Sequence, residues 1–142
     1  LIVELAVYDK ESNAVESTEQ SLIEDGFQGT PAFKCFVATV DDKVVGTALI
    51  YNRFSTWKGK ILHLEDLIVT QKMRGHGIGT ALLDEVVKYG YHLKVKRINW
   101  EVISWNNGAI KLYERQGAKV LRNWNVVHLD EKGIETYITK LN

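Results

Sequence analysis

The segment RGHGIGTALL, residues 74–83, places glycine at three alternate positions directly before an apolar helical pattern. Glycine at a helix start carries an entropic cost, which indicates that bare backbone is needed there. The first amides of a helix lack intrahelical partners and carry the positive end of the helix dipole, so a phosphate can bind to them closely where no side chain intervenes. We therefore interpret Gly75, Gly77 and Gly79, with positive charge from Lys72 and Arg74, as a cradle for a pyrophosphate. A tight turn in which the glycines serve only sterics is the alternative.

Two other phosphate-binding loops do not fit this segment. The nucleoside-triphosphate loop needs Gly-Lys-Ser/Thr after its last glycine, whereas Thr80 and Ala81 follow Gly79. The dinucleotide fingerprint needs G-x-G-x-x-G and an acidic residue at the end of the next strand. Here the spacing is G-x-G-x-G, and the next strand candidate, RINWEVIS (97–104), ends without an acidic residue.

The hydrophobic periodicity predicts a single domain over residues 1–142 with an α+β fold. LIVELAVYDK (1–10) resembles the second half of an amphipathic helix, and a second short helix follows a capping-box pair, Ser17 and Gln20, and ends near Gly26. Strands are expected at 32–40, 44–54, 60–69 and 97–104, and helices at 80–94 and 106–117. The last two strands are expected at 118–129 and 133–141, joined by a turn at 130–133.

Composition excludes several classes of partner. Eighteen basic and eighteen acidic side chains cancel, which argues against nucleic acid. No apolar run approaches the roughly 20 residues of a membrane span. The single Cys35 cannot form an internal disulfide, so a cytoplasmic setting is expected. His63, His76, His92 and His128 lack metal-ligand spacing with it, so no metal is expected.

The glycine segment, R-G-H-G-I-G-T, resembles the Q/R-x-x-G-x-G/A loop of the GNAT superfamily of acyl-CoA-dependent N-acetyltransferases. WNNGAIKLYERQGA (105–118) is similar to that family's second signature, and LEDLIV (64–69) to the strand before its loop. LAVYD, LIEDGF, STWKG and HLEDLIV resemble the diamine (spermidine/spermine-like) branch, and STWKG resembles members that prefer thialysine. The resemblance implies a central mixed, mostly antiparallel sheet with flanking helices. We expect the first strand of the family fold to be missing from this chain, because LIVELAVYD matches the middle of its first helix.

The resemblance also implies acetyl-CoA as cosubstrate and assigns residues to it. Backbone groups on the strand would pair with the pantetheine arm, the glycine loop would hold the pyrophosphate, and Asn106 would bind the pantetheine while also capping its helix. Tyr113 would donate a proton to the leaving thiolate, with a core aromatic as the alternative. The cofactor-binding residues expected are Leu67, Ile68, Val69, Arg74, Gly75, His76, Gly77, Ile78, Gly79, Thr80, Asn106 and Tyr113.

On the acceptor side, the resemblance implies a direct transfer to an amine. Glu65 is expected to be the catalytic base, and a regular strand would turn Asp66 to the opposite face; a solvated charge is the alternative for Glu65. The substrate-binding residues expected are Tyr8, Asp9, Trp57, Glu65 and Asp66. Ser55 stands where diamine-type members carry Asp, which favours a short lysine-like amine or small diamine over a long polyamine.

Two other functions stay open: acetylation of a protein lysine or N-terminus, and a non-catalytic acyl-CoA-binding module. A homodimer is expected, because this branch pairs through its C-terminal strands.

Overall fold

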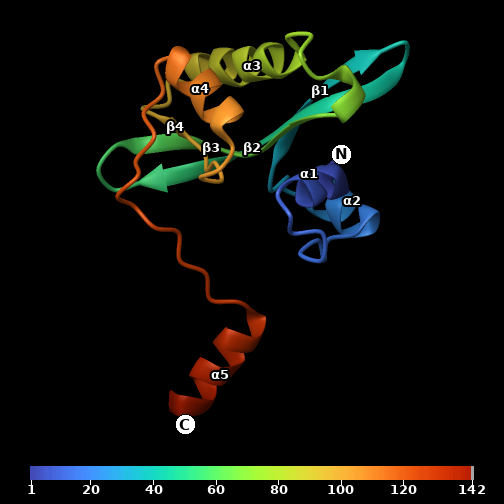
Figure 1. Cartoon of the computed structure of the whole chain (residues 1–142). Helices are drawn as coiled ribbons and strands as arrows, with labels where there is room; N and C mark the ends of the chain where they lie inside the picture. The colour runs from blue at the N-terminus through green and yellow to red at the C-terminus, as the bar shows by residue number, and fades with distance from the viewer. Residues whose placement is uncertain (142) are drawn as a thin grey trace. The chain divides into compact units, whose positions relative to one another are not determined.

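The computed structural model describes residues 1–141, which fall into two compact units. The first runs from Leu1 to Ile103, and the second begins at Ser104. The first unit contains α1 (Ile2–Tyr8), α2 (Glu19–Phe27), β1 (Lys34–Val40), β2 (Lys43–Ser55), β3 (Gly59–Val69), the 3-10 turn η1 (Gln71–Met73), α3 (Ile78–His92) and β4 (Ile98–Asn99) (Figure 1). The second contains α4 (Asn107–Arg115) and α5 (Glu131–Leu141). The single domain over 1–142 stays a prediction.

The four strands form one mixed sheet in the order β1-β2-β3-β4. The β1–β2 and β2–β3 pairs are antiparallel, and the short β3–β4 pair is parallel. Figure 1 shows α3 lying along one face of this sheet, where it contacts β1, β2 and β3, while α1 and α2 lie on the other side. The predicted α+β class is therefore confirmed.

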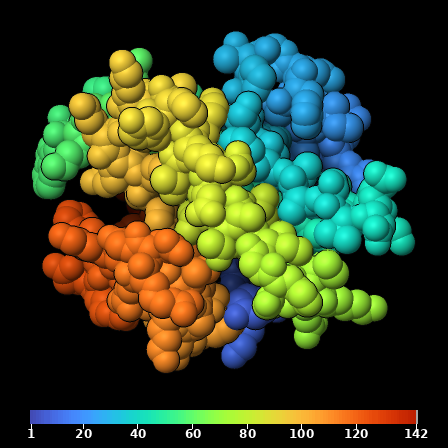
Figure 2. Space-filling view, turned by 90° about the horizontal axis from the view of Figure 1, so that it is seen from above, coloured from blue at the N-terminus to red at the C-terminus, as the bar shows by residue number. Residues whose placement is uncertain are grey.

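Part of the core lies between α3 and the sheet. A small residue in β2 brings the two close, since a Cβ on Gly46 would lie 3.0 Å from Leu82 Cδ1. Seen from above, residues of α3 cover this face of the first unit, and the segment that leads into α3 lies at the surface beside them (Figure 2). The most deeply buried apolar side chains are Ala48, Ile50, Ile61, Leu62, Leu64, Leu83 and Val86.

Most of the predicted elements are present, with three corrections. The cap of α2 is Thr18, whose side chain accepts from Ser21 N at 3.1 Å in a reciprocal capping box, so the predicted Ser17–Gln20 pair is wrong by one residue. The strand predicted over 97–104 shortens to the two residues of β4, because its pairing with β3 ends there.

The two strands predicted after residue 117 are wrong. Residues 118–129 form no strand, and residues 131–141 form α5. Asp130, read as a turn residue, accepts from Gly133 N at 2.7 Å and so caps a helix. The apolar residues that follow recur at helical spacing, at positions 134, 137, 138 and 141, which overrides the β-propensity of this segment.

No helix within residues 1–141 is long and apolar enough to cross a bilayer.

The β1–β2 turn allows a test of its left-handed backbone conformation. Asp41 and Asp42 have φ values of 48° and 60°, the left-handed conformation of a two-residue hairpin turn. We expect Asp42→Gly to raise the free energy of unfolding by about 0.5–1 kcal/mol, because glycine removes the left-handed strain but costs backbone entropy. Asp42→Ala, which keeps the strain without the polar side chain, should lower it. Urea denaturation of both variants decides this, and a destabilised glycine variant would contradict the turn geometry.

Candidate functional site

The glycine turn ends in open amide groups at the start of α3. Gly77, with φ of 80°, is the N-cap of this helix, and it has no side chain that could bond to the first amides. The first bond within the helix runs from Ala81 N to Gly77 O at 2.9 Å, so the amides of residues 78–80 have no intrahelical partner. These groups lie beside exposed residues 75–77. The arrangement suits an anionic ligand.

The three glycines differ in why they are glycine. Gly75 and Gly77 both have φ of 80°, so the backbone of the turn itself requires them. Gly79 has ordinary helical geometry, and an added Cβ would only touch Val69 Cγ2 at 3.7 Å. The steric alternative therefore accounts for two of the glycines, whereas neither the backbone conformation nor a close contact requires glycine at position 79.

Within residues 1–141, the end of the strand that leads to this turn is unpaired along one edge. Thr70 N donates to Val45 O at 2.8 Å, so by the antiparallel alternation residues 66 and 68 also direct their backbone groups to β2. Leu67 and Val69 then direct theirs to the opposite edge. The recorded pairing of β4 with that edge stops at His63. The backbone groups of Leu67 and the N–H of Val69 are therefore placed to meet an extended ligand, whereas Ile68, predicted with them, directs its backbone groups into the sheet.

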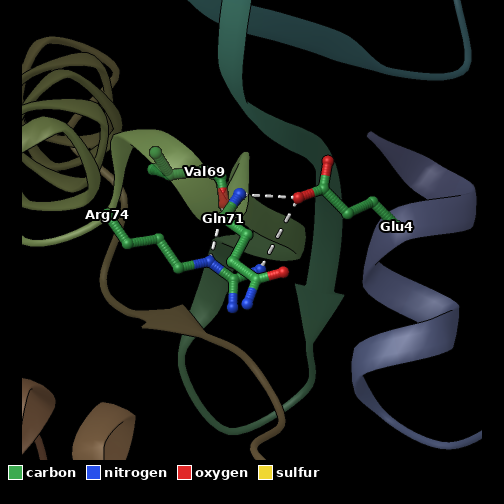
Figure 3. A network of polar contacts seen from close by, with 4 residues as sticks. All are labelled: Glu4, Val69, Gln71 and Arg74. Carbon is green, nitrogen blue, oxygen red and sulfur yellow. Dashed lines mark hydrogen bonds and ion pairs between the residues drawn. The ribbon is translucent and has the colours of Figure 1, made fainter.

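Arg74 is turned away from the glycines, toward the end of β3 and α1. Its Nε donates to Val69 O at 2.8 Å (Figure 3). Its guanidinium lies 4.7 Å from the centre of the Tyr8 ring. Its Nη2 lies 4.0 Å from Glu4 Oε1. Arg74 thus fixes the entry to the glycine turn, and Tyr8 supports it.

Glu4 completes this contact between α1 and the turn. Its Oε1 accepts from the backbone N of Gln71 at 2.7 Å, a bond between residues 67 positions apart (Figure 3). This hydrogen bond is the first cause that lowers the pKa of Glu4, with the Thr70 side chain and the Arg74 charge adding to it and burial opposing it. Sequence reasoning missed Glu4, since nothing local marks it.

A β-bulge at Glu65 changes the predicted orientation of the two carboxylates. Leu49 pairs with Asp66 and Ile50 with Leu64, so Glu65 is the extra residue, with no partner on β2. Leu64 faces α3 with Ile50, and Asp66 lies with Leu49 on the opposite face. The Glu65 side chain lies on that same face, where its Oε2 is 3.3 Å from His63 Nε2. The prediction that Glu65 and Asp66 lie on opposite faces, which assumed a regular strand, is therefore wrong.

Asp9 joins these two carboxylates from the end of α1. Burial, followed by the charges of Glu65 and Asp9, raises the pKa of Asp66. Burial also raises the pKa of Asp9. Three of the predicted substrate-binding residues are thus brought together into one acidic cluster, Asp9, Glu65 and Asp66, that favours a cation.

Two side chains approach the Glu65 carboxylate, and a third supports one of them; sequence reasoning missed all three. Burial raises the pKa of Tyr51, and the charge of Glu65 and a polar contact with its side chain add to this, so the Tyr51 hydroxyl lies close to the carboxylate. His63 approaches it from the same strand and contacts Asn99 of β4 in turn. No local motif marks these residues, because cross-strand register brings them together.

The remaining predicted residues lie elsewhere. Trp57, 80% exposed, lies in the β2–β3 turn, and the strand from Gly59 to Asp66 separates it from the acidic cluster by about 23 Å at ~3.3 Å per residue. His76 is exposed, with Nδ1 3.3 Å from Met73 O. In the second unit, Asn106 caps α4 as predicted by accepting from Ala109 N at 3.2 Å, and Tyr113 is buried. Their contacts with a cofactor stay predictions.

No group of three or more His, Cys, Asp or Glu side chains that could hold a metal ion occurs in the described part of the chain.

The fold and these features belong to a known class of enzyme. The acetyltransferase (GNAT) family matches residues 4–118. A solved integron cassette protein from V. cholerae superposes with a TM-score of 0.77 at 26% identity, covering 96% of this chain and 86% of that one. The chain therefore belongs to the GNAT family and is an N-acetyltransferase.

Within that family the chain resembles the thialysine and spermidine/spermine branch. It is 37% identical over 129 residues to the thialysine N-epsilon-acetyltransferase of Bos taurus, covering 85% of this chain and 76% of that protein. It is 35% identical over 136 residues to the spermidine/spermine N(1)-acetyltransferase-like protein 1 of Homo sapiens. That match covers 91% of this chain and only 20% of the human protein.

Asp66 gives a pH-dependent test of the acidic cluster. Its raised pKa means that the folded chain holds a proton there more tightly than the unfolded chain. Its contribution to stability is thus full below the ordinary Asp value of 3.8 and is lost as pH rises through the higher folded pKa. We expect Asp66→Asn to melt at a higher temperature than the parent at pH 7, and the difference to vanish well below pH 3.8.

Thermal melts across this pH range check the expectation, with Asp84→Asn on the exposed side of α3 as a charge-matched control. A lower melting temperature of the Asp66 variant at neutral pH would show that the carboxylate is stabilised rather than strained by its neighbours.

Proposed function

We propose that the enzyme transfers an acetyl group from acetyl-CoA directly to the primary amine of a small molecule, a lysine-like amine or a small diamine. One observation carries the proposal: β3 joins the two binding sites that such a reaction needs, one for the amine and one for the acyl-CoA. The bulged residues Glu65 and Asp66 present an acidic face to a cation, and the strand then runs, with an open edge, into the glycine turn. An amine and an acyl-CoA bound to β3 would meet near residue 66.

The features of the turn and of the strand edge fit coenzyme A. The open amides of residues 78–80 suit its pyrophosphate, and Gly79 keeps them accessible. The outward groups of Leu67 and the N–H of Val69 suit the amide-rich pantetheine arm, which would bind as an added strand. Val69 O already accepts from Arg74, so pairing along this edge would end at that residue. The cosubstrate supplies the activated acetyl thioester.

The acidic cluster fits the ammonium form of the acceptor. Two adjacent carboxylates and Asp9 attract the cation, and a carboxylate must then take its proton before the amine can attack. Glu65 is the base in this proposal, directly or through water. Asp66, the next residue, would provide a second proton acceptor, since burial and then the Glu65 charge raise its pKa.

Tyr113 and Asn106 complete the proposal by their match to the family signature. Tyr113 would protonate the departing thiolate of coenzyme A, and Asn106 would bind the pantetheine arm from the start of α4. Asn106 caps α4 as predicted and Tyr113 lies within that helix, which supports the match.

The size of the cluster supports a short acceptor. Its three carboxylates lie together at one end of the strand, enough for one ammonium, and Ser55 at the far turn offers no further charge to a long polyamine. The bovine relative is named a thialysine N-epsilon-acetyltransferase, which is consistent with a lysine-like acceptor.

A coenzyme A release assay over a panel of amines tests the proposal. We expect turnover with thialysine, lysine analogues and small diamines, and much less with spermine or peptides. Turnover confined to peptides would favour a protein lysine or N-terminus as acceptor. Acetyl-CoA binding without turnover on any amine would favour a non-catalytic module.

We also propose a homodimer in a cytoplasmic setting. The predicted C-terminal strands are absent, so they cannot form the interface. The exposed apolar side chains of the second unit support the dimer instead, because a second copy would cover them. They include Leu121, Trp124, Val127, Leu129 and Leu141. Sedimentation at micromolar concentration should give a dimer, and a monomer would contradict this.

A substitution at Gly79 tests the phosphate cradle without disturbing the backbone of the glycine turn. Gly79→Val adds a side chain to the helix start at a position without left-handed strain, so the fold should be retained while amide approach is blocked. We expect acetyl-CoA affinity to fall about tenfold or more, ~1.4 kcal/mol or above. Ala81→Val, the same side chain two residues later at an exposed position, should leave it unchanged. Equal affinity in both variants by calorimetry would exclude the cradle.

Tyr113→Phe tests the proton donor. The substitution keeps the buried ring and removes the hydroxyl, so kcat should fall about 10²–10⁴-fold, the range of general acid catalysis. Acetyl-CoA affinity should change little. Tyr137→Phe, on the exposed side of α5, is the control for the same change. Unaltered single-turnover rates in the Tyr113 variant would remove its assigned role.

A further inference from the structure

His63 is a buried polar side chain that the proposed reaction does not use. It is 6% exposed and lies in β3, directly opposite Tyr51 on β2. The two rings are 5.0 Å apart at an interplanar angle of 36°. A histidine buried in a sheet needs a partner for each ring nitrogen, so its neighbours define its protonation.

The partner of Nδ1 is the Asn99 amide. Asn99 Nδ2 lies 2.7 Å from His63 Nδ1, and an amide nitrogen only donates. Nδ1 therefore accepts, and the proton of a neutral ring lies on Nε2. That nitrogen is 3.3 Å from Glu65 Oε2, so an N–H group faces a carboxylate.

The opposite orientation of the Asn99 amide would oppose this contact. Asn99 Oδ1, which is buried and has no hydrogen-bond partner among the described residues, would then accept from a proton on Nδ1. A neutral ring would in that case turn the lone pair of Nε2 toward the Glu65 carboxylate, which is repulsive. The contact between Nε2 and Glu65 Oε2 therefore favours the orientation in which Asn99 Nδ2 donates to Nδ1 and the proton lies on Nε2.

Glu65 needs such a support because of the bulge. As the extra residue of β3 it has no cross-strand partner, and its side chain is 51% exposed. The Tyr51 hydroxyl and His63 Nε2 both approach its carboxylate, and Asn99 of β4 contacts His63. Side chains from β2 and β3 thus approach this half-exposed carboxylate, and a side chain from β4 holds one of them.

We propose that His63, held by Asn99 with its proton on Nε2, is a positioning residue that orients the Glu65 carboxylate toward the acceptor amine. The inference rests on the proposed function, because it assigns a task to the contact around the proposed base. Orientation of a reacting group can contribute about 10²-fold when its misplacement is of the order of 1 Å.

Kinetics of three variants test the positioning. His63→Phe keeps a planar ring against Tyr51 and removes both nitrogens, and should lower kcat about 10–100-fold while leaving acetyl-CoA affinity unchanged. His63→Gln, whose amide nitrogen can replace Nε2, should recover much of this loss. In the Glu65→Gln background, His63→Phe should have little further effect, because the group it orients is already disabled. An equal loss in both backgrounds would overturn the proposal.

The ring protonation is measured independently of turnover. Nitrogen-15 spectra of the parent protein should show the Nε2–H form of His63, and Glu65→Gln should shift the Nε2 resonance. Asn99→Leu should weaken the preference for this form. An Nδ1–H form in the parent would refute the inference.

If no amine is acetylated while Glu65→Gln shifts the Nε2 resonance, the proposed function fails and the contact between His63 and Glu65 stands. If amines are acetylated and the resonance does not respond, the acetyl transfer stands and the positioning role is overturned.

Discussion

A single extra residue in β3 determines how the first unit presents its chemistry. Before Glu65, the strand turns Leu62 and Leu64 toward α3, and after it the strand turns Leu67 and Val69 the same way. Without the bulge, the side chains that follow would exchange faces, and Asp66 would be directed into the apolar layer under Leu82 and Leu83. Burying an unpaired carboxylate there costs several kcal/mol or more. The insertion keeps the core apolar on one face and gathers the acidic groups on the other.

The bulge also explains why the two faces of β3 serve different purposes. The face toward α3 is closely packed, with Gly46 giving the helix room to approach. The opposite face carries Tyr51, His63 and the acidic cluster, and it meets α1 through Asp9. The titratable groups are thus gathered on the face away from α3, where Ile61 and Ile68 are also buried and Glu65 remains half exposed.

The sequence predicted those features whose causes are local. Glycine spacing before a helical pattern indicated the turn at residues 74–79, and Asn106 was recognisable as a helix cap because a cap acts within three residues. The orientation of Asp66 was mispredicted, because a bulge depends on the register between two strands and leaves no mark in one of them. Glu4, 67 positions from Gln71, and His63, 36 from Asn99, were missed for the same reason. The helix α5 was misread because Asp130 suits a turn and a helix cap equally well.

The open edge of β3 has a consequence for how copies of this chain meet one another. An unpaired strand edge that can bind an extended ligand can equally pair with the edge of another molecule, which is how sheets begin to aggregate. Here the bulge at Glu65 interrupts the edge on one side, and Arg74 occupies the carbonyl of Val69 on the other. The accessible stretch is thereby reduced to about three residues, roughly 10 Å of strand. Such a length gives a small ligand its hydrogen bonds while offering a neighbouring chain too little to extend a sheet.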